Sequence, residues 1–91
     1  MGGKMKLYDS NNKKELTKLV GSNVRYYRNL YNLNHKEQIT QAALAEIIGV
    51  STGLIGTLES EKQIVSVPVL WNISQVLNIR MDQLFEEPKI K

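Results

Sequence analysis

Apolar residues recur at intervals of three or four along most of this chain, and this spacing predicts amphipathic helices rather than strands. The first helix is expected from residue 13 to Asn32, because Asn12 and Glu15 fit a capping box at its start. Its apolar stripe comprises Leu16, Val20, Val24, Tyr27 and Tyr31. Gly21 interrupts this pattern, where glycine lowers helix stability by about 1 kcal/mol relative to alanine. A glycine at this position is consistent with close packing of a second helix.

The stretch from Thr40 to Glu59 predicts two short helices, 41–48 and 52–60, joined by a tight turn. Thr40 and Ser51 are N-cap candidates, because a hydroxyl there accepts a hydrogen bond from a first-turn N–H. Gly49 is placed to end the first of these helices in the left-handed conformation. The apolar positions are Leu44, Ala45 and Ile48 in the first helix and Leu54, Ile55 and Leu58 in the second. This order of caps, helices and turn predicts a helix-turn-helix.

Two more helices are expected at 67–77 and 80–86, so the predicted fold is all-α with five helices. Ser66 is the N-cap candidate of the fourth helix, and Pro68 falls in its first turn, where a missing N–H is tolerated. Asn78 can end the same helix in the left-handed conformation.

The fourth helix is apolar on more than one face. Its expected core stripe is Val67, Leu70, Ser74 and Leu77, flanked by Trp71 and Ile73. Val69 and Val76 lie on the far side, and this excess of apolar surface predicts burial by the fifth helix or by a second subunit. In the fifth helix, Met81, Leu84 and Phe85 are expected to face the core or an interface.

These elements divide the chain into a flexible N-terminal arm, 1–11, a helical domain, 12–87, and a short C-terminal tail, 88–91. The polar stretch 33–38 has the character of an insertion between the first two helices. It contains His35, the only histidine. A metal site needs several converging ligands, so this residue is interpreted as a surface side chain.

Composition narrows the class of protein. A chain of 91 residues fits one domain, and it has no cysteine for a disulfide or a thiolate metal site. No apolar run approaches the roughly 20 residues that a membrane helix needs, and the N-terminus lacks the apolar block of a secretory signal. We therefore expect a soluble, cytoplasmic protein that makes no membrane contact.

Basic residues are concentrated in the first part of the chain. The net charge is +3, but residues 1–36 carry +6 and residues 37–91 carry −3. The part that contains the helix-turn-helix is therefore acidic, which argues against a strong electrostatic grip on DNA from that part alone. Solvated faces of mixed sign are the alternative explanation for many of these charges.

Residues of the helix-turn-helix carry a resemblance to a known family. The matching positions are Gln41, Leu44, Ala45, Gly49, Val50, Ser51, Ile55, Leu58 and Glu59. In this order and spacing they resemble the Cro/phage-repressor type of helix-turn-helix DNA-binding domain, and the resemblance extends from about Val20 to Phe85. The chain departs from the family at 33–38, which is longer than usual, and at Glu61, where the family usually has glycine.

The resemblance implies that the second helix of the motif, about 52–60, enters the major groove of double-stranded DNA. The candidate DNA-contacting residues are Thr40, Gln41, Ser51, Thr52, Gly53, Thr57, Ser60, Lys62 and Gln63. Among them, Thr52, Gly53 and Thr57 occupy the family's base-reading positions. No Arg, Asn or Gln lies on this helix to make a bidentate base contact, so modest direct readout with a contribution from DNA shape is expected.

The resemblance also implies an ion pair between Arg28 and Glu59 that ties the first helix to the end of the recognition helix. Its role would be structural, and removing one partner of such a buried pair costs about 3–5 kcal/mol.

Together these features predict a sequence-specific transcriptional regulator, most simply a dimeric repressor, with no cofactor or metal. Two half-sites about 34 Å apart would each take one subunit. The expected dimer interface comprises Met81, Phe85, Val69 and Val76. No enzymatic constellation is present in the sequence. Two alternatives remain: a domain that has kept the fold but lost DNA binding, and an antitoxin or anti-repressor that binds a protein partner through the outward-facing Ile47 and Leu54.

Overall fold

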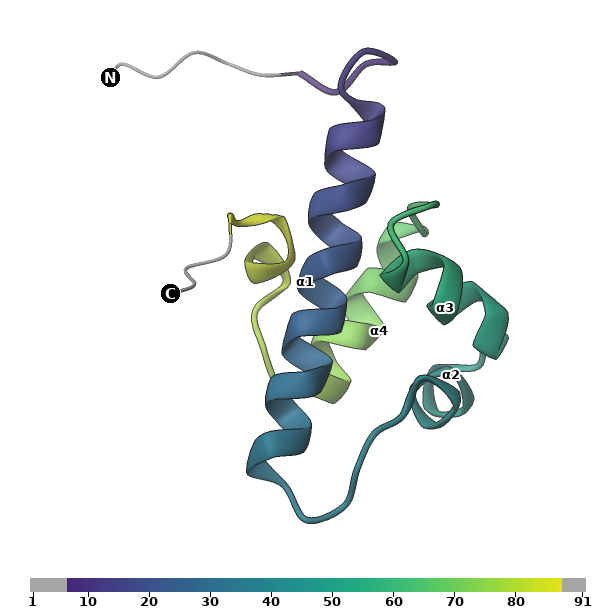
Figure 1. The fold of residues 1–91 in the computed structure, drawn as a ribbon, viewed down its shortest axis with the longest axis vertical. Coiled ribbons are helices and arrows are strands. Elements are labelled where there is room, and N and C mark those ends of the chain that lie inside the picture. Colours follow the sequence, from purple (N-terminus) through teal and green to yellow (C-terminus); the bar gives the residue numbers. More distant parts are fainter. Residues whose placement is uncertain (1–6, 88–91) are drawn as a thin grey trace.

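A long first helix, α1 (Lys13–Asn34), runs through the molecule, with the 3-10 helix on one side of it and α3 and α4 on the other, while α2 packs on α3 and α4 (Figure 1). The computed structural model describes residues 7–87. The first part of the predicted arm and the predicted tail 88–91 lie outside the described residues. The remaining elements are α2 (Gln41–Ile48), α3 (Thr52–Glu59), α4 (Val67–Leu77) and a 3-10 helix, η1 (Met81–Phe85).

The prediction of an all-α fold is confirmed, whereas the count of five α-helices is wrong. Within residues 7–87 there are four α-helices, and the fifth element is the 3-10 helix η1. Five residues are too few for a ladder of i to i+4 hydrogen bonds, so the tighter 3-10 pattern is favoured. Arg80 fixes the start of η1, because its backbone N–H donates to Oε1 of Gln83 at 2.8 Å.

The first helix ends at Asn34, two residues later than predicted. The side chains of its last turn reach back to helix carbonyls. Asn34 Nδ2 donates to the carbonyl of Leu30 at 3.0 Å, and His35 Nδ1 lies 2.9 Å from the carbonyl of Tyr31. The His35 ring also stacks on the Tyr31 ring with centroids 3.7 Å apart. The Tyr31 carbonyl is one of the last four of the helix, which have few intrahelical partners, so His35 belongs to the helix end.

Most of the predicted helix ends are confirmed. Thr40 Oγ1 accepts from Ala43 N at 3.0 Å, and Ser51 Oγ accepts from Leu54 N at 3.1 Å. Gly49 has φ of 80°, and Asn78 has φ of 59°, so both end their helices in the left-handed conformation.

Two predicted caps are wrong in detail, since neither Asn12 nor Ser66 makes a side-chain cap hydrogen bond. The Asn12 side chain instead holds the residues that precede α1. Its Oδ1 accepts from Asp9 N at 2.8 Å, and its Nδ2 donates to the Leu7 carbonyl at 2.6 Å. At the start of α4, Pro68 lies in the first turn as expected.

The hydrophobic core lies between α1 and the other elements. Its buried members are Val20, Val24, Ile39, Leu44, Ala45, Ile55, Leu58, Leu70, Ile73, Leu77 and Leu84. The predicted faces of α4 need correction, because Val67 and Trp71 are 67% and 55% exposed, whereas Val69 and Val76 are half-buried against the core. The reason is that α4 packs against α1, α2 and η1 together, so its buried face is wider and rotated from the predicted stripe.

Gly21 allows the backbone of α1 to pack directly on the end of α3. A Cβ atom at this position would overlap the carbonyl oxygen of Leu58 and lie 3.3 Å from Cα of Glu61. The glycine therefore sets how close α3 sits to α1, as its place in the sequence suggested. None of the helices within residues 7–87 has the length and apolar character needed to span a membrane.

Candidate nucleic-acid interface

The outward face of α3 is made of small and hydroxylated side chains. Thr52, Gly53 and Ser60 are exposed and Thr57 is half-buried, while Ile55 and Leu58 point into the core. Thr57 Oγ1 donates to the Gly53 carbonyl at 2.8 Å. Its hydroxyl proton is therefore used within the helix, and its oxygen lone pairs and its methyl group remain for a contact outside.

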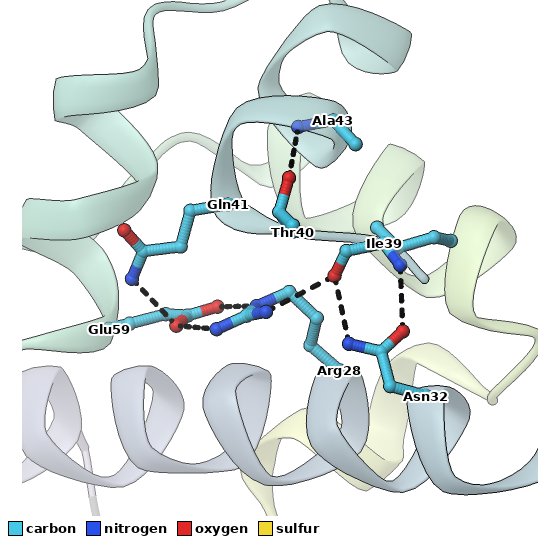
Figure 2. A network of polar contacts seen from close by, with 7 residues as sticks. All are labelled: Arg28, Asn32, Ile39, Thr40, Gln41, Ala43 and Glu59. Atoms are coloured by element: carbon cyan, nitrogen blue, oxygen red, sulfur yellow. Dashed lines mark hydrogen bonds and ion pairs between the residues drawn. The ribbon is translucent and has the colours of Figure 1, made fainter. Parts of the chain in front are cut away.

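The end of α3 is fastened to α1 by a two-point ion pair (Figure 2). Arg28 Nε donates to Oε2 of Glu59 at 2.7 Å, and Nη2 donates to Oε1 at 2.9 Å. The side chains are 13% and 2% exposed. The hydrogen bond to Glu59 raises the pKa of Arg28, and Coulomb attraction acts in the same direction against the opposing effect of burial. The arginine is consequently charged at every pH at which the protein would be studied.

Two further groups extend this pair into a network that includes the start of α2. Arg28 Nη1 donates to the Ile39 carbonyl at 3.1 Å, and Gln41 Nε2 donates to Oε1 of Glu59 at 2.9 Å (Figure 2). The Glu59 carboxylate thus receives hydrogen bonds from both α1 and α2. Shared polar networks of this kind fix the relative positions of the elements that contribute to them.

Gln41, a predicted DNA contact, is therefore already engaged within the protein. Its amide nitrogen is bonded to Glu59, and its Oε1 faces Gly56 of α3. The residue would reach DNA only with its remaining amide atoms or after giving up this bond. Sequence comparison with the family did not reveal this contact, because the partner lies 18 residues away on another helix.

Asn32 is a structural residue that the sequence analysis missed. Its Oδ1 accepts from Ile39 N at 2.7 Å, and its Nδ2 donates to the Ile39 carbonyl at 3.0 Å. One side chain therefore satisfies both polar groups of a residue buried just before α2 (Figure 2). An asparagine followed by a polar insertion was the only available signal, and it was interpreted as the end of the helix.

The segment after α3 carries the remaining predicted phosphate contacts. Lys62 and Gln63 are exposed, and the Lys62 backbone N–H donates to the Thr57 carbonyl at 3.1 Å. Glu61 has φ of 67°, which is the left-handed conformation that the family's usual glycine adopts easily. The turn therefore keeps its backbone shape although the side chain disfavours it.

The other predicted DNA contacts surround α3. Thr40 and Ser51 are exposed at the N-terminal ends of α2 and α3, and both serve as caps. Across residues 7–87, no three acidic, histidine or cysteine side chains gather where a metal ion could bind. Hydroxyls, an amide and a lysine around a glycine-containing helix are suited to contact with a polar, anionic surface.

Comparison with known proteins places this arrangement in a family. A model of the helix-turn-helix family matches residues 24–84. The chain belongs to the Cro/C1-type helix-turn-helix family. Members of this family are DNA-binding transcriptional regulators, and at that level of description so is this chain.

The chain is also similar to a known relative and to a solved structure. The chain is 29% identical over 77 residues to the control protein C.SmaI of Serratia marcescens, covering 85% of this chain and 84% of that protein. It also resembles the solution structure of the SOS-response transcriptional repressor LexA from Eubacterium rectale. That match has a TM-score of 0.66 and 22% identity, and it covers 85% of this chain and 76% of the other. At this identity the structural match supports the fold alone.

Proposed function

We propose that this protein is a dimeric, sequence-specific repressor that reads the major groove with α3. The observation that carries the proposal is the outward face of α3, where Thr52 and Gly53 are exposed and Thr57 is half-buried. Threonine hydroxyls bond base edges or phosphates, and threonine methyl groups contact thymine. Gly53 adds no side chain and lets the helix backbone approach the DNA closely.

Phosphate contacts would lie on both sides of this helix. Thr40, Gln41 and Ser51 stand at helix N-termini, whose free N–H groups and dipoles favour an anion. At the other end of α3, Ser60, Lys62 and Gln63 would contact the sugar-phosphate backbone of the second DNA strand. Such contacts position the protein and add affinity without selecting sequence.

A dimer would supply the affinity that one small module lacks. Met81 is half-buried and Phe85 is 40% exposed, so both present apolar surface near η1. Val69 and Val76 would contribute their remaining exposed edges. Sedimentation equilibrium of the wild type and of Phe85→Glu tests this interface, and a wild type that stays monomeric at high concentration would contradict it.

A DNA-binding assay over a salt series tests the proposed function. The protein is titrated against duplexes from its own upstream region and against random duplexes of equal length. Binding should favour one sequence and weaken steeply as salt rises, because the protein displaces counterions from phosphates. Absence of any sequence-dependent and salt-dependent binding would refute the proposal.

Binding of a protein partner is the second candidate function, favoured by one observation. Ile47 of α2 is 58% exposed, and Leu54 of α3 is half-buried beside the turn. An antitoxin or anti-repressor would bury this surface. Ile47→Glu would then abolish binding of the partner and leave DNA affinity unchanged. If the protein acts through DNA alone, Ile47→Glu would leave its regulatory activity unchanged as well.

A further inference from the structure

A polar hollow of about 300 Å³ lies where α1, α2 and α3 meet. The exposed side chains that line it are Arg25 and Asn29 of α1 and Ser60 at the end of α3. The buried Arg28–Glu59 pair and Gln41 line it from within. Arg25 and Asn29 are four residues apart and therefore neighbours on the surface of one helix.

The charge of this hollow is positive. The one carboxylate, that of Glu59, already receives hydrogen bonds from Arg28 and Gln41. Within residues 7–87, the side chains of Arg25 and Asn29 make no hydrogen bond or ion pair. An unengaged guanidinium beside a neutralised ion pair leaves a site with one net positive charge and several hydrogen-bond donors, which suits a phosphate group.

The hollow also adjoins the face of α3 that is proposed to read bases. Gly56 and Ser60 line it, and each lies three residues after a residue of that face, Gly53 and Thr57 respectively. Gly56 has no side chain to fill the space. A duplex with α3 in its major groove would therefore bring its own backbone towards the hollow.

We propose that this hollow seats a phosphate of the DNA backbone, with Arg25 as its charged contact and Asn29 as a neutral donor. The Ser60 hydroxyl donates to the Thr57 carbonyl at 3.1 Å, so this residue forms part of the wall of the seat. The inference rests on the proposed DNA-binding function, and it adds a residue of α1 that the family resemblance did not supply. It also assigns a DNA contact to one of the basic residues of 1–36, the part of the chain that carries a net charge of +6. Residues 37–91 are acidic and supply few such cations.

The test compares Arg25→Gln, Arg25→Lys and a charge-matched control, Lys13→Gln. Lys13 is an exposed residue of the same helix, about 18 Å from Arg25 along its axis at roughly 1.5 Å per residue. The probe is a duplex selected by the wild-type protein from a random-sequence library. Arg25→Gln should bind about tenfold more weakly to every sequence, and the slope of log affinity against log salt should shrink by about one. Arg25→Lys should keep that slope, and Lys13→Gln should match the wild type.

Duplexes with a single neutral methylphosphonate linkage then locate the phosphate. One linkage should weaken binding of the wild type and have no effect on Arg25→Gln, because the contact is already lost. The phosphate seat is refuted if the wild type binds DNA, Arg25→Gln has the same DNA affinity as Lys13→Gln, and no single linkage has an effect that depends on Arg25. The proposed function would stand in that case. If the wild type binds no duplex, the proposed function fails first.

Free phosphate is the other source of the same chemistry, and titration with inorganic phosphate distinguishes it. Saturable NMR shifts at Arg25, Asn29 and Ser60 in millimolar phosphate, without coupling to any DNA linkage, would overturn the assignment to the DNA backbone. Coupling to one linkage, with weak or no response to free phosphate, would support it.

Discussion

Arg28 on the first helix and Glu59 at the end of α3 face each other through two hydrogen bonds of 2.7 and 2.9 Å. This contact bridges 31 residues of sequence and fixes the end of α3 against α1. Since Glu59 is 2% exposed, the carboxylate depends on protein groups rather than on water for its stabilisation.

Replacing Arg28 with methionine should lower the free energy of unfolding by about 3 kcal/mol, because it leaves a buried carboxylate with only Gln41 as partner. Urea denaturation measures the change. Arg80→Met is the matched control. Arg80 pairs with Asp82 at 3.0 Å, but the two side chains are 69% and 64% exposed, so the loss should stay below about 1 kcal/mol. Equal losses for the two variants would show that burial of Glu59 does not matter.

Gly21 and Gly56 should respond in opposite directions to alanine. Gly21→Ala should lower the free energy of unfolding by about 1–3 kcal/mol, because its methyl group would overlap the Leu58 carbonyl oxygen. Gly56→Ala should raise it by up to about 1 kcal/mol, because the methyl group would lie 3.5 Å from Gln41 Oε1, an ordinary contact, and alanine favours the helix. Thermal and urea denaturation of both variants check the signs. Two changes of the same sign would contradict the close approach of α1 to α3.

Glu61→Gly should raise the free energy of unfolding by about 1 kcal/mol, because glycine adopts φ of 67° without the penalty of a side chain. Glu61→Gln serves as the control, since it removes the charge and keeps the backbone penalty. A gain for both variants would assign the effect to charge. In DNA-binding assays both variants should bind at least as tightly as the wild type, because each removes a negative charge beside Lys62.

Thr57→Ala should relax base preference, whereas Lys62→Ala should weaken binding to all sequences alike. Binding to the selected duplex and to its single-base variants measures both effects. Thr57→Ala would flatten the affinities at one position, and Lys62→Ala would lower all of them and reduce the salt slope by about one. Identical behaviour would mean that α3 is not the reading helix.

The helix-turn-helix was predictable from the sequence because its signals are local. Thr40, Ser51 and Gly49 define caps and a turn within a few residues, and the apolar spacing fixes which face of each helix is buried. The faces of α4 were not predictable to the same degree. Val69 and Trp71 are equally apolar in the sequence, and only the neighbouring helices decide that the first is half-buried and the second is exposed.

The candidate site divides in the same way. The residues on α3 follow from helical periodicity once the buried positions are known. The hydrogen bond between Gln41 and Glu59 forms only because α2 and α3 pack together, and the hollow beside Arg25 needs α1 as well. This packing of separate helices cannot be read from the spacing of residues in the sequence. The 3-10 form of η1 was missed because a turn of five residues has almost the same apolar pattern in either helical form.

The two hydrogen bonds between the Asn32 side chain and the Ile39 peptide groups fix the start of the helix-turn-helix on α1. A change in the length of the segment before Ile39 should therefore leave the position of the motif unchanged. Residues 33 and 34 belong to α1, so the segment between the two helices is fastened by α1 at Asn34 on one side and by the Ile39 peptide groups on the other. Lengthening a loop whose ends are already fixed costs only about 0.6 kcal/mol for each doubling of its length. This segment is therefore a natural site for inserting a fluorophore-bearing peptide or an affinity tag, at which the position of α3 would not change.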